Sequence, residues 1–390
     1  MLAARRAVES AEAGILQADV SPNPVLSYNA ASIGRGIGPG AITEKRIDNT
    51  IRIDQVIERG NKRELRVEAA KGLERAAESD AGEVLRQQLL LTRNAYADLQ
   101  QAQGKTGILA GMADLFSRTY AAAQTRQKAG DLASADVARV QVDFERAQND
   151  FRVSQAELAR SKLALAHLLA DEAAAPALRA SDPWPAAVAP ELAEIERAII
   201  QYFESRPDIL AARARIEATE KLRDLARSQR TRDVTVGAQF ERFPGNLPTN
   251  SVGFGVSIPL LIGNDFSGDI RRAEIDHYAA QDALEKVRAV AATEIARAAS
   301  DVRAAADRRA RYEGSLLAAA QRSADAAEFA FQRGATSVLE VLDARRTLRA
   351  VQLEALAARA DFAKALYAWR ANLGAAISPA LESGTPAGDK

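Results

Sequence analysis

The two histidines, His167 and His277, are the residue types in this chain best suited to catalysis or metal binding. His277 follows Asp276, but a single histidine–carboxylate pair on a helical segment is usually surface chemistry. His167 lies in an apolar helical stretch and is expected to pack in the core. The chain has no cysteine, which removes thiol nucleophiles, thiolate metal sites and disulfides. The sequence therefore predicts no catalytic residue, no metal site and no cofactor, and the chain is not expected to be an enzyme.

The composition is typical of long helices. Apolar residues make up 47% of the 390 residues but aromatic residues only 5%, which suits narrow packing seams of small side chains. Lys and Arg together number 52, as do Asp and Glu, so no affinity for nucleic acid is expected. No run of about 18 apolar residues occurs, and a membrane-spanning helix is therefore not predicted.

Glycine and proline mark the limits of four long helical segments. Two stretches, residues 40–175 and 260–378, contain no proline. Gly130 and Gly334 interrupt them, and each should reverse the chain so that two helices pack as an antiparallel hairpin. The predicted helices cover about residues 62–128, 132–169, 267–333 and 337–373.

Short segments of alternating polarity lie between the helices. One of them places Val252, Phe254, Val256 and Ile258 on one face and glycine or serine on the other. Such alternation is typical of a strand with one apolar wall and one polar wall. The predicted strands cover about residues 24–33, 46–57, 232–243 and 250–262, with hairpin loops at 34–40 and 244–248.

The chain is an internal duplication. Leu2-Ala3-Ala4-Arg5 matches residues 210–213, and Gly130 matches Gly334 in a block that continues without a gap. The predicted organisation is a first repeat at 1–170, a linker at 171–190, a second repeat at 191–374 and a flexible tail at 375–390. Because the helical lead-in of the second repeat has no counterpart before Leu2, roughly 20 or more residues and any signal sequence are expected to precede this chain.

These strands need more than one chain. Four strands cannot enclose a passage, their polar walls need water, and their edges need partners. Three copies would supply twelve strands, which can close around a wet interior. The helices would then form a long tube of antiparallel pairs beneath the strands.

Three segments resemble the TolC-type outer-membrane factors. Residues 206–212, Arg-Pro-Asp-Ile-Leu-Ala-Ala, are similar to the family's helix that leads into a strand. Asn23-Pro24-Val25-Leu26 resembles its entry into the first strand, and residues 334–344, Gly-Ala-Thr-Ser-Val-Leu-Glu-Val-Leu-Asp-Ala, resemble its turn from glycine into a helix. The resemblance implies a mainly α fold with a small β part, in which a homotrimer forms a twelve-stranded β-barrel on a long antiparallel helical tunnel.

The resemblance also implies a function. Such proteins are exit ducts of tripartite efflux systems in the outer membrane of Gram-negative bacteria, with a long periplasmic part. The implied partners are a periplasmic adaptor protein, an inner-membrane RND-type pump and outer-membrane lipid. The lipid would contact the strand face that carries Val252, Phe254, Val256 and Ile258.

A gate is implied near the hairpin turns. Matching residue by residue places the acidic periplasmic gate of the family at Asp136, Glu340 and Asp343. Helical spacing of three puts Glu340 and Asp343 on one face. Threefold symmetry would turn these acids into rings of carboxylates, which favour cations. The alternative is that they are ordinary solvated surface acids.

The same turns are expected to contact the adaptor and to hold a latch. Arg139 and Arg333 could pair with acids of neighbouring helices, although Thr336 stands where the family can carry a latch arginine. The alternative for the two glycines is that they only end helices. The residues expected to dock the adaptor are Gly130, Leu132, Ser134, Gly334 and Ser337.

One further segment resembles the heavy-metal, CzcC-like branch of the family. There the segment ends in Glu-Leu-Gly-Gly-Lys-Arg, and residues 58–63 of this chain, Glu-Arg-Gly-Asn-Lys-Arg, keep four of those six residues. Heavy-metal cations are therefore the favoured cargo. The alternatives are a drug or polypeptide duct of the same family and a structural or adaptor protein with coiled-coil hairpins. An adaptor usually has one such hairpin and lipoyl-like β domains, whereas two hairpins and four strands are predicted here.

Overall fold

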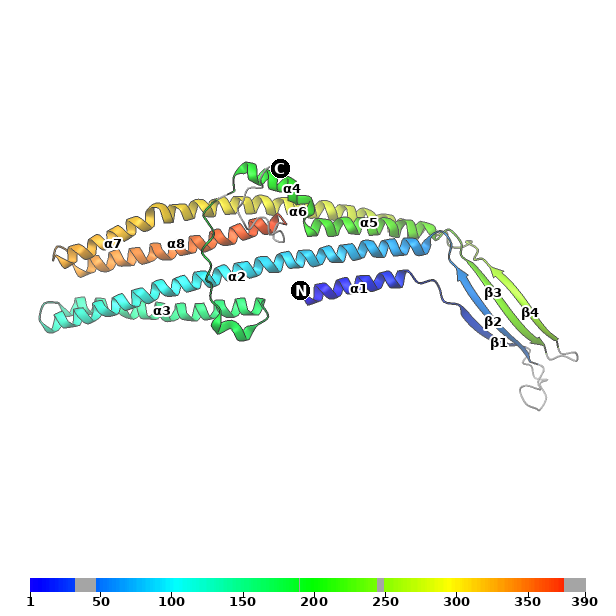
Figure 1. Cartoon of the computed structure of the whole chain (residues 1–390), viewed down its shortest axis with the longest axis horizontal. Coiled ribbons are helices and arrows are strands. Elements are labelled where there is room, and N and C mark those ends of the chain that lie inside the picture. Colours follow the sequence, from blue (N-terminus) through cyan, green and yellow to red (C-terminus); the bar gives the residue numbers. More distant parts are fainter. Residues whose placement is uncertain (32–46, 189, 244–248, 375–390) are drawn as a thin grey trace, which may run out of the picture. The chain divides into compact units, whose positions relative to one another are not determined.

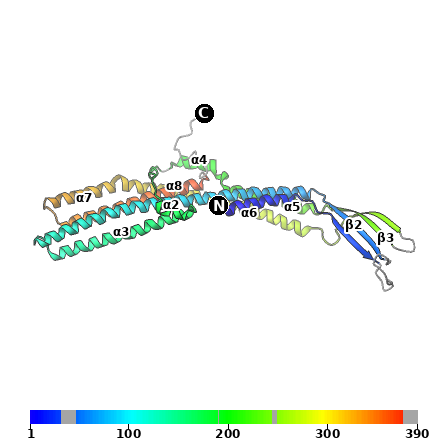
Figure 2. The same ribbon diagram turned by 60° about the horizontal axis from the view of Figure 1, so that its bottom comes forward.

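A computed structural model describes the chain apart from residues 32–46, 189, 244–248 and 375–390 (Figures 1 and 2). The predicted hairpin loops and C-terminal tail lie outside the described residues. The chain divides into two compact units. Unit 1 comprises Met1–Gly82 and Pro207–Arg288, and unit 2 comprises Glu83–Arg206 and Ala289–Lys390. Each unit therefore draws on both halves of the sequence, and the division into repeats stays a prediction about the sequence.

Unit 1 contains a sheet and four helical segments. The helices are α1 (Leu2–Ala18), the first part of α2 (Lys62–Lys128), α5 (Pro207–Ser228) and the first part of α6 (Ser267–Arg311). Pro207 begins α5, where its missing N–H costs nothing because that donor would have no partner in the helix. Small residues set how closely the helices pack: a Cβ at Gly72 of α2 would lie 2.9 Å from the Ala218 Cβ of α5.

The sheet has four antiparallel strands in the order β1-β2-β3-β4 (Figure 1). They are β1 (Val25–Ala31), β2 (Asp48–Ile57), β3 (Val234–Phe243) and β4 (Thr249–Ser257). The predicted strand at 250–262 ends early, so Ile258 lies outside β4. Pro259 explains the difference, because proline cannot donate a ladder hydrogen bond and fixes its own φ.

Unit 2 is built from two long helical hairpins that lie side by side in both views (Figures 1 and 2). The remainder of α2 pairs with α3 (Ser134–Leu168), and α7 (Leu317–Gln332) pairs with α8 (Val338–Asn372). A π-helical turn, Tyr312–Leu316, joins α6 to α7, so the predicted helix at 267–333 is not one regular α-helix. The smaller elements are a 3-10 helix at Glu172–Ala177, α4 at Leu192–Tyr202 and a 3-10 turn at Phe203–Ser205. The mainly helical fold with four strands is confirmed.

Apolar clusters hold unit 2 together, and the two that contain the largest side chains lie in different places. One gathers aromatic and aliphatic side chains of α4, α6 and α8, and the other lies near the hairpin turns. The first includes Ile195, Ile295, Val302, Phe362, Leu366 and Trp369. The second includes Met112, Phe116, Val137, Val140 and Leu342. Alanines fill the spaces between these larger residues, as the composition predicted.

Two buried arginines donate hydrogen bonds to carbonyls at the C-terminal end of α8. Arg206 is 1% exposed, and its guanidinium donates to the Asn372 carbonyl and to Glu294, each at 2.9 Å. Arg86 is also buried, and its Nη1 donates to the Ala371 carbonyl at 3.1 Å. Carbonyls in the last turn of a helix have no partner within it, and positive charge there is favourable. Arg86 and Arg206 therefore fix the end of α8 in unit 2.

The predicted environments of the two histidines were wrong, and the structure reverses them. The His167 side chain is 79% exposed and lies 3.3 Å from Glu172, because the outward face of α3 carries it. His277 is only 7% exposed and contacts Thr219 Oγ1 at 3.2 Å and the Gln281 amide at 3.0 Å. His277 is thus a buried residue between α5 and α6, whose ring nitrogens both have hydrogen-bond partners. None of the described helices has a segment long and apolar enough to cross a membrane.

Candidate functional site

The two hairpin turns lie at the same end of unit 2 and have the same backbone geometry (Figure 1). Gly130 and Gly334 adopt positive φ values of 84° and 72°. After them, the Asp131 N–H donates to the Arg126 carbonyl and the Ala335 N–H donates to the Ala330 carbonyl, each at 2.9 Å. This arrangement ends a helix with a left-handed residue, which glycine adopts without strain. A Cβ at either glycine would meet nothing within 4 Å. Glycine is therefore favoured at these positions by the positive φ of the backbone and not by a lack of space.

Apolar and cation–π contacts join the two hairpins just behind these turns. Leu342 of α8 packs in one cluster with Val137 and Val140 of α3 and with Phe116 of α2. The Arg126 guanidinium at the end of α2 lies 5.5 Å from the ring centroid of Phe331 on α7. An ion pair between Arg346 and Asp143 further connects α8 to α3. The two turns therefore form one end surface.

Glu340 and Asp343 lie together on this surface. Both are exposed and line an open groove of about 430 Å³ between α7 and α8. The Ser337 side chain caps α8 by accepting from the Glu340 N–H at 3.4 Å, and the Thr336 hydroxyl donates to the Glu340 carboxylate. The other lining residues are Ser323, Ala327, Leu339, Ala344 and Thr347, none of them basic. We call this site the acidic groove.

Asp136 and the two predicted latch arginines are arranged differently. Asp136 does not line the acidic groove, and its carboxylate lies 3.6 Å from Arg139 one turn later on α3. Arg333 lies over the Phe329 ring, with its guanidinium 4.7 Å from the ring centroid. In a single chain, both arginines thus contact residues of their own hairpins. The predicted docking residues Ser134 and Ser337 are exposed, and Leu132 is half-buried against the cluster behind the turns.

The π-helical turn between α6 and α7 has an ion-pair cluster that the sequence did not reveal. Glu313 accepts a hydrogen bond from Arg359 of α8 at 2.6 Å and forms an ion pair with Arg309 of α6 at 3.1 Å. Burial alone would raise the pKa of Glu313, but these two guanidinium groups hold it below its usual value. The cluster fixes the helix at the turn, where the regular α-helical hydrogen bonding is interrupted.

The sheet of unit 1 has two chemically different faces. Its apolar face is exposed to solvent in the single chain, and Phe254 is 86% exposed. Its polar face carries Arg52, Asp54, Gln239 and Glu241, which the register brings to one side. The large side chains of the apolar face are Leu26, Tyr28, Ile51, Ile53, Val236, Phe240, Val252, Phe254 and Val256. An apolar surface of this extent requires an apolar partner.

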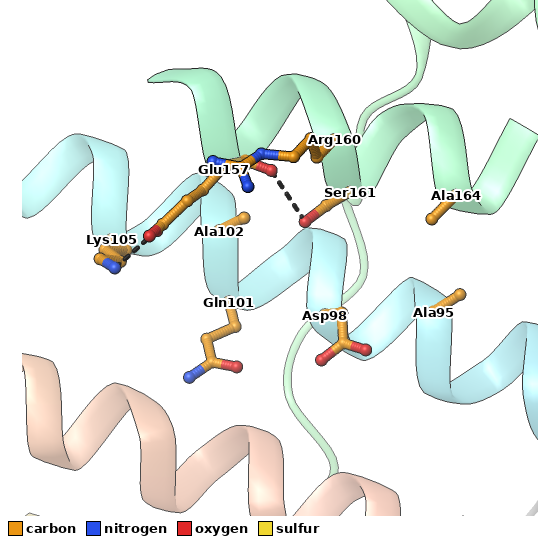
Figure 3. A pocket seen from close by; sticks show the side chains of 9 residues that line it. All are labelled: Ala95, Asp98, Gln101, Ala102, Lys105, Glu157, Arg160, Ser161 and Ala164. Carbon is orange, nitrogen blue, oxygen red and sulfur yellow. Dashed lines mark hydrogen bonds and ion pairs between the residues drawn. The ribbon is translucent and has the colours of Figure 1, made fainter. Parts of the chain in front are cut away.

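A second groove lies between α2 and α3 in unit 2 (Figure 3). It measures about 500 Å³, and its lining includes the small residues Ala95, Ala102 and Ala164. An ion pair crosses it, with Lys105 Nζ 2.5 Å from Glu157 Oε2 (Figure 3). Asp98 of α2 also lines the groove, but its carboxylate points away from α3 and pairs with Lys364 of α8. Its acids and bases alternate, so the groove has no strong charge preference. Within the described ranges, no three His, Cys, Asp or Glu side chains gather as the ligands of a metal ion.

Comparisons with known proteins agree with this architecture. Residues 199–375 match the family model described as outer membrane efflux protein. The chain is 27% identical over 351 residues to the cobalt-zinc-cadmium resistance protein CzcC of Cupriavidus metallidurans. This alignment covers 89% of this chain and 79% of CzcC.

Solved structures share the fold. The outer membrane protein VceC of Vibrio cholerae aligns with a TM-score of 0.75 at 19% identity, over 96% of this chain and 92% of VceC. The channel protein CusC aligns with a TM-score of 0.76 at 19% identity, over 95% of this chain and 87% of CusC. At these identities, the two structures establish the shared fold.

Proposed function

We infer from its match to the outer membrane efflux protein family and its likeness to CzcC that this chain is the exit duct of an efflux system in the outer membrane of a Gram-negative bacterium. The family is one of channels and not of enzymes. Its members form trimeric channels that work with adaptor and pump proteins. For this chain we propose a homotrimer that receives its cargo from a periplasmic adaptor and an inner-membrane RND-type pump.

The exposed apolar face of the sheet is the observation that carries this proposal. It spans all four strands, from Leu26 on β1 to Phe254 on β4, and its opposite face is polar and charged. Three such sheets joined edge to edge would form a twelve-stranded barrel with lipid outside and water inside. The residues assigned to lipid contact are Val252, Phe254 and Val256 of β4, with Ile258 just beyond its end.

Heavy-metal cations are the favoured cargo. The likeness to CzcC supports this choice, because that protein is named for resistance to cobalt, zinc and cadmium. A duct must release what it conducts, and tight binding would slow passage. Exposed carboxylates such as those of the acidic groove would bind cations only weakly. They therefore suit cation passage better than an enclosed set of metal ligands would.

The full-length protein should behave as an integral outer-membrane channel. We expect it in the outer-membrane fraction, extracted only by detergent, as a trimer that SDS dissociates and that opens ion channels in planar bilayers. Deleting its gene should lower tolerance to cobalt, zinc or cadmium. A monomer recovered without detergent would contradict the duct, whereas unchanged metal tolerance with a functional channel would reassign the cargo.

The acidic groove should control how easily ions enter the channel. Replacing both acids, Glu340→Ala with Asp343→Ala, removes two carboxylates per chain from the proposed gate. We expect higher single-channel conductance and weaker block by divalent cations, because carboxylate rings bind such cations at a narrow mouth. Asp325→Ala is the matched control, since it removes an exposed acid of α7 that does not line the groove. Equal conductance and block in all three proteins would exclude the gate.

A further inference from the structure

The polar face of the sheet holds a connected charge network. Arg52 Nε lies 2.9 and 2.8 Å from the two carboxylate oxygens of Asp54, and its Nη1 donates to Gln239 Oε1 on the next strand at 3.3 Å. The Gln239 amide in turn donates to Glu241 Oε1 at 2.7 Å. Ser251 of β4 donates to Glu241 Oε2 at 3.3 Å. The network therefore runs across β2, β3 and β4.

Glycines make room for these side chains. Asp54 of β2 pairs with Gly237 of β3, and Gly237 pairs with Gly255 of β4. The side chains of β2 can therefore extend over positions where β3 and β4 have no side chain. A Cβ at Gly237 would lie 2.2 Å from Asp54 Oδ1, and one at Gly255 would lie 3.5 Å from Arg52 Nη2. The Arg52 guanidinium is therefore held close to the sheet surface. Its positive charge has a fixed position on the polar face.

The network leaves the charges of the face unequally compensated. Arg52 forms its ion pair with Asp54. Among the described residues, the hydrogen-bond donors to the Glu241 carboxylate are Gln239 and Ser251, and both are neutral. Neutral donors orient a carboxylate without cancelling its charge. Glu241 also lies nearer the loop ends of β3 and β4 than Arg52 does, because Glu241 pairs with Ser251 near the start of β4.

We propose that this network sets the charge selectivity of the passage at the level of the sheet. Glu241 attracts cations, and Arg52 limits the negative charge of the wall by neutralising Asp54. The inference rests on the proposed function, since the polar face lines a passage only when copies of the sheet close around it. In a trimer, each of these groups would occur three times around the water-filled interior.

Ion selectivity measurements test this assignment directly. In planar bilayers with a KCl gradient near 0.1 M, Arg52→Gln should raise the K⁺-over-Cl⁻ permeability ratio by about twofold or more, because the Debye length there is about 10 Å. Glu241→Gln should lower the ratio by a similar factor, while Glu241→Asp should preserve it. Near 1 M salt, where the Debye length is about 3 Å, all ratios should converge.

A charge-balanced double variant separates electrostatics from structural damage. Arg52→Gln with Asp54→Asn removes one charge of each sign, so its permeability ratio should stay at the wild-type value. If both single variants form channels with the wild-type ratio, the selectivity assignment is wrong. If Arg52→Gln does not assemble, the permeability ratios of Glu241→Gln and Glu241→Asp are compared instead. Equal ratios for these two variants would then contradict the selectivity assignment. Failure of the wild-type protein itself to form channels would instead overturn the proposed function.

Discussion

Phe254→Arg should prevent the chain from assembling in the outer membrane. Phe254 is 86% exposed and lies on the apolar face, where it pairs with Ala238 in the register of β3 and β4. An arginine near the midplane of a bilayer on the lipid side of a β-strand costs about 2–4 kcal/mol. Three copies per assembly multiply that cost. The trimer recovered from outer membranes, measured by fractionation and native electrophoresis, should fall to a small fraction of the wild-type amount.

Ile200→Arg is the matched control for this substitution. Ile200 on α4 is 84% exposed, almost the same as Phe254, but it belongs to the helical unit that we assign to the periplasm. A charge at a position already in water should change stability by less than about 0.5 kcal/mol. Phe254→Leu should also assemble normally. Equal amounts of trimer for Phe254→Arg and Ile200→Arg would refute lipid contact by the apolar face.

Arg206→Ala should strongly destabilise unit 2. The substitution removes a fully buried guanidinium that donates to the Asn372 carbonyl and to Glu294, and it leaves those acceptors and a cavity behind. Losing one partner of a buried pair typically costs about 3–5 kcal/mol, and we expect about 2–4 kcal/mol here because the Glu294 side chain is 43% exposed. The expected readouts are a lower midpoint of chemical unfolding and faster proteolysis near the end of α8.

An exposed arginine gives the comparison for Arg206. Arg215 of α5 pairs with Asp80 of α2, and their side chains are 48% and 47% exposed. Exposed pairs contribute roughly 0–1 kcal/mol, so Arg215→Ala should shift the unfolding midpoint only slightly. Similar shifts for Arg206→Ala and Arg215→Ala would mean that burial of Arg206 contributes little to the stability of unit 2.

The backbone of this fold was largely predictable because local chemistry determines it. Gly130 and Gly334 end long proline-free helical stretches, and both adopt the left-handed conformation that glycine tolerates. Alternation of polarity located the strands, although the end of β4 depended on Pro259. These signals act within a few residues of each other, so a single sequence contains them.

Features that depend on distant residues were not predictable. Whether a histidine is buried depends on which helix packs over it, and the apolar neighbours of His167 misled the assignment. Arg52 and Gln239 are 187 positions apart, so only the register of β2 with β3 reveals their contact. The π-helical turn at Tyr312–Leu316 is likewise held by Arg359 of another helix. Arg206 was recognised within a sequence pattern, but its buried contacts with the end of α8 were not.

The even number of strands has a consequence for how copies can join. In the order β1-β2-β3-β4 every neighbour is antiparallel, so β1 and β4 run in opposite directions. When β4 of one copy meets β1 of the next in an antiparallel pair, both copies point the same way. With three or five strands per copy, the same head-to-tail contact would be parallel. Parity therefore lets identical copies, all pointing the same way, close a fully antiparallel ring.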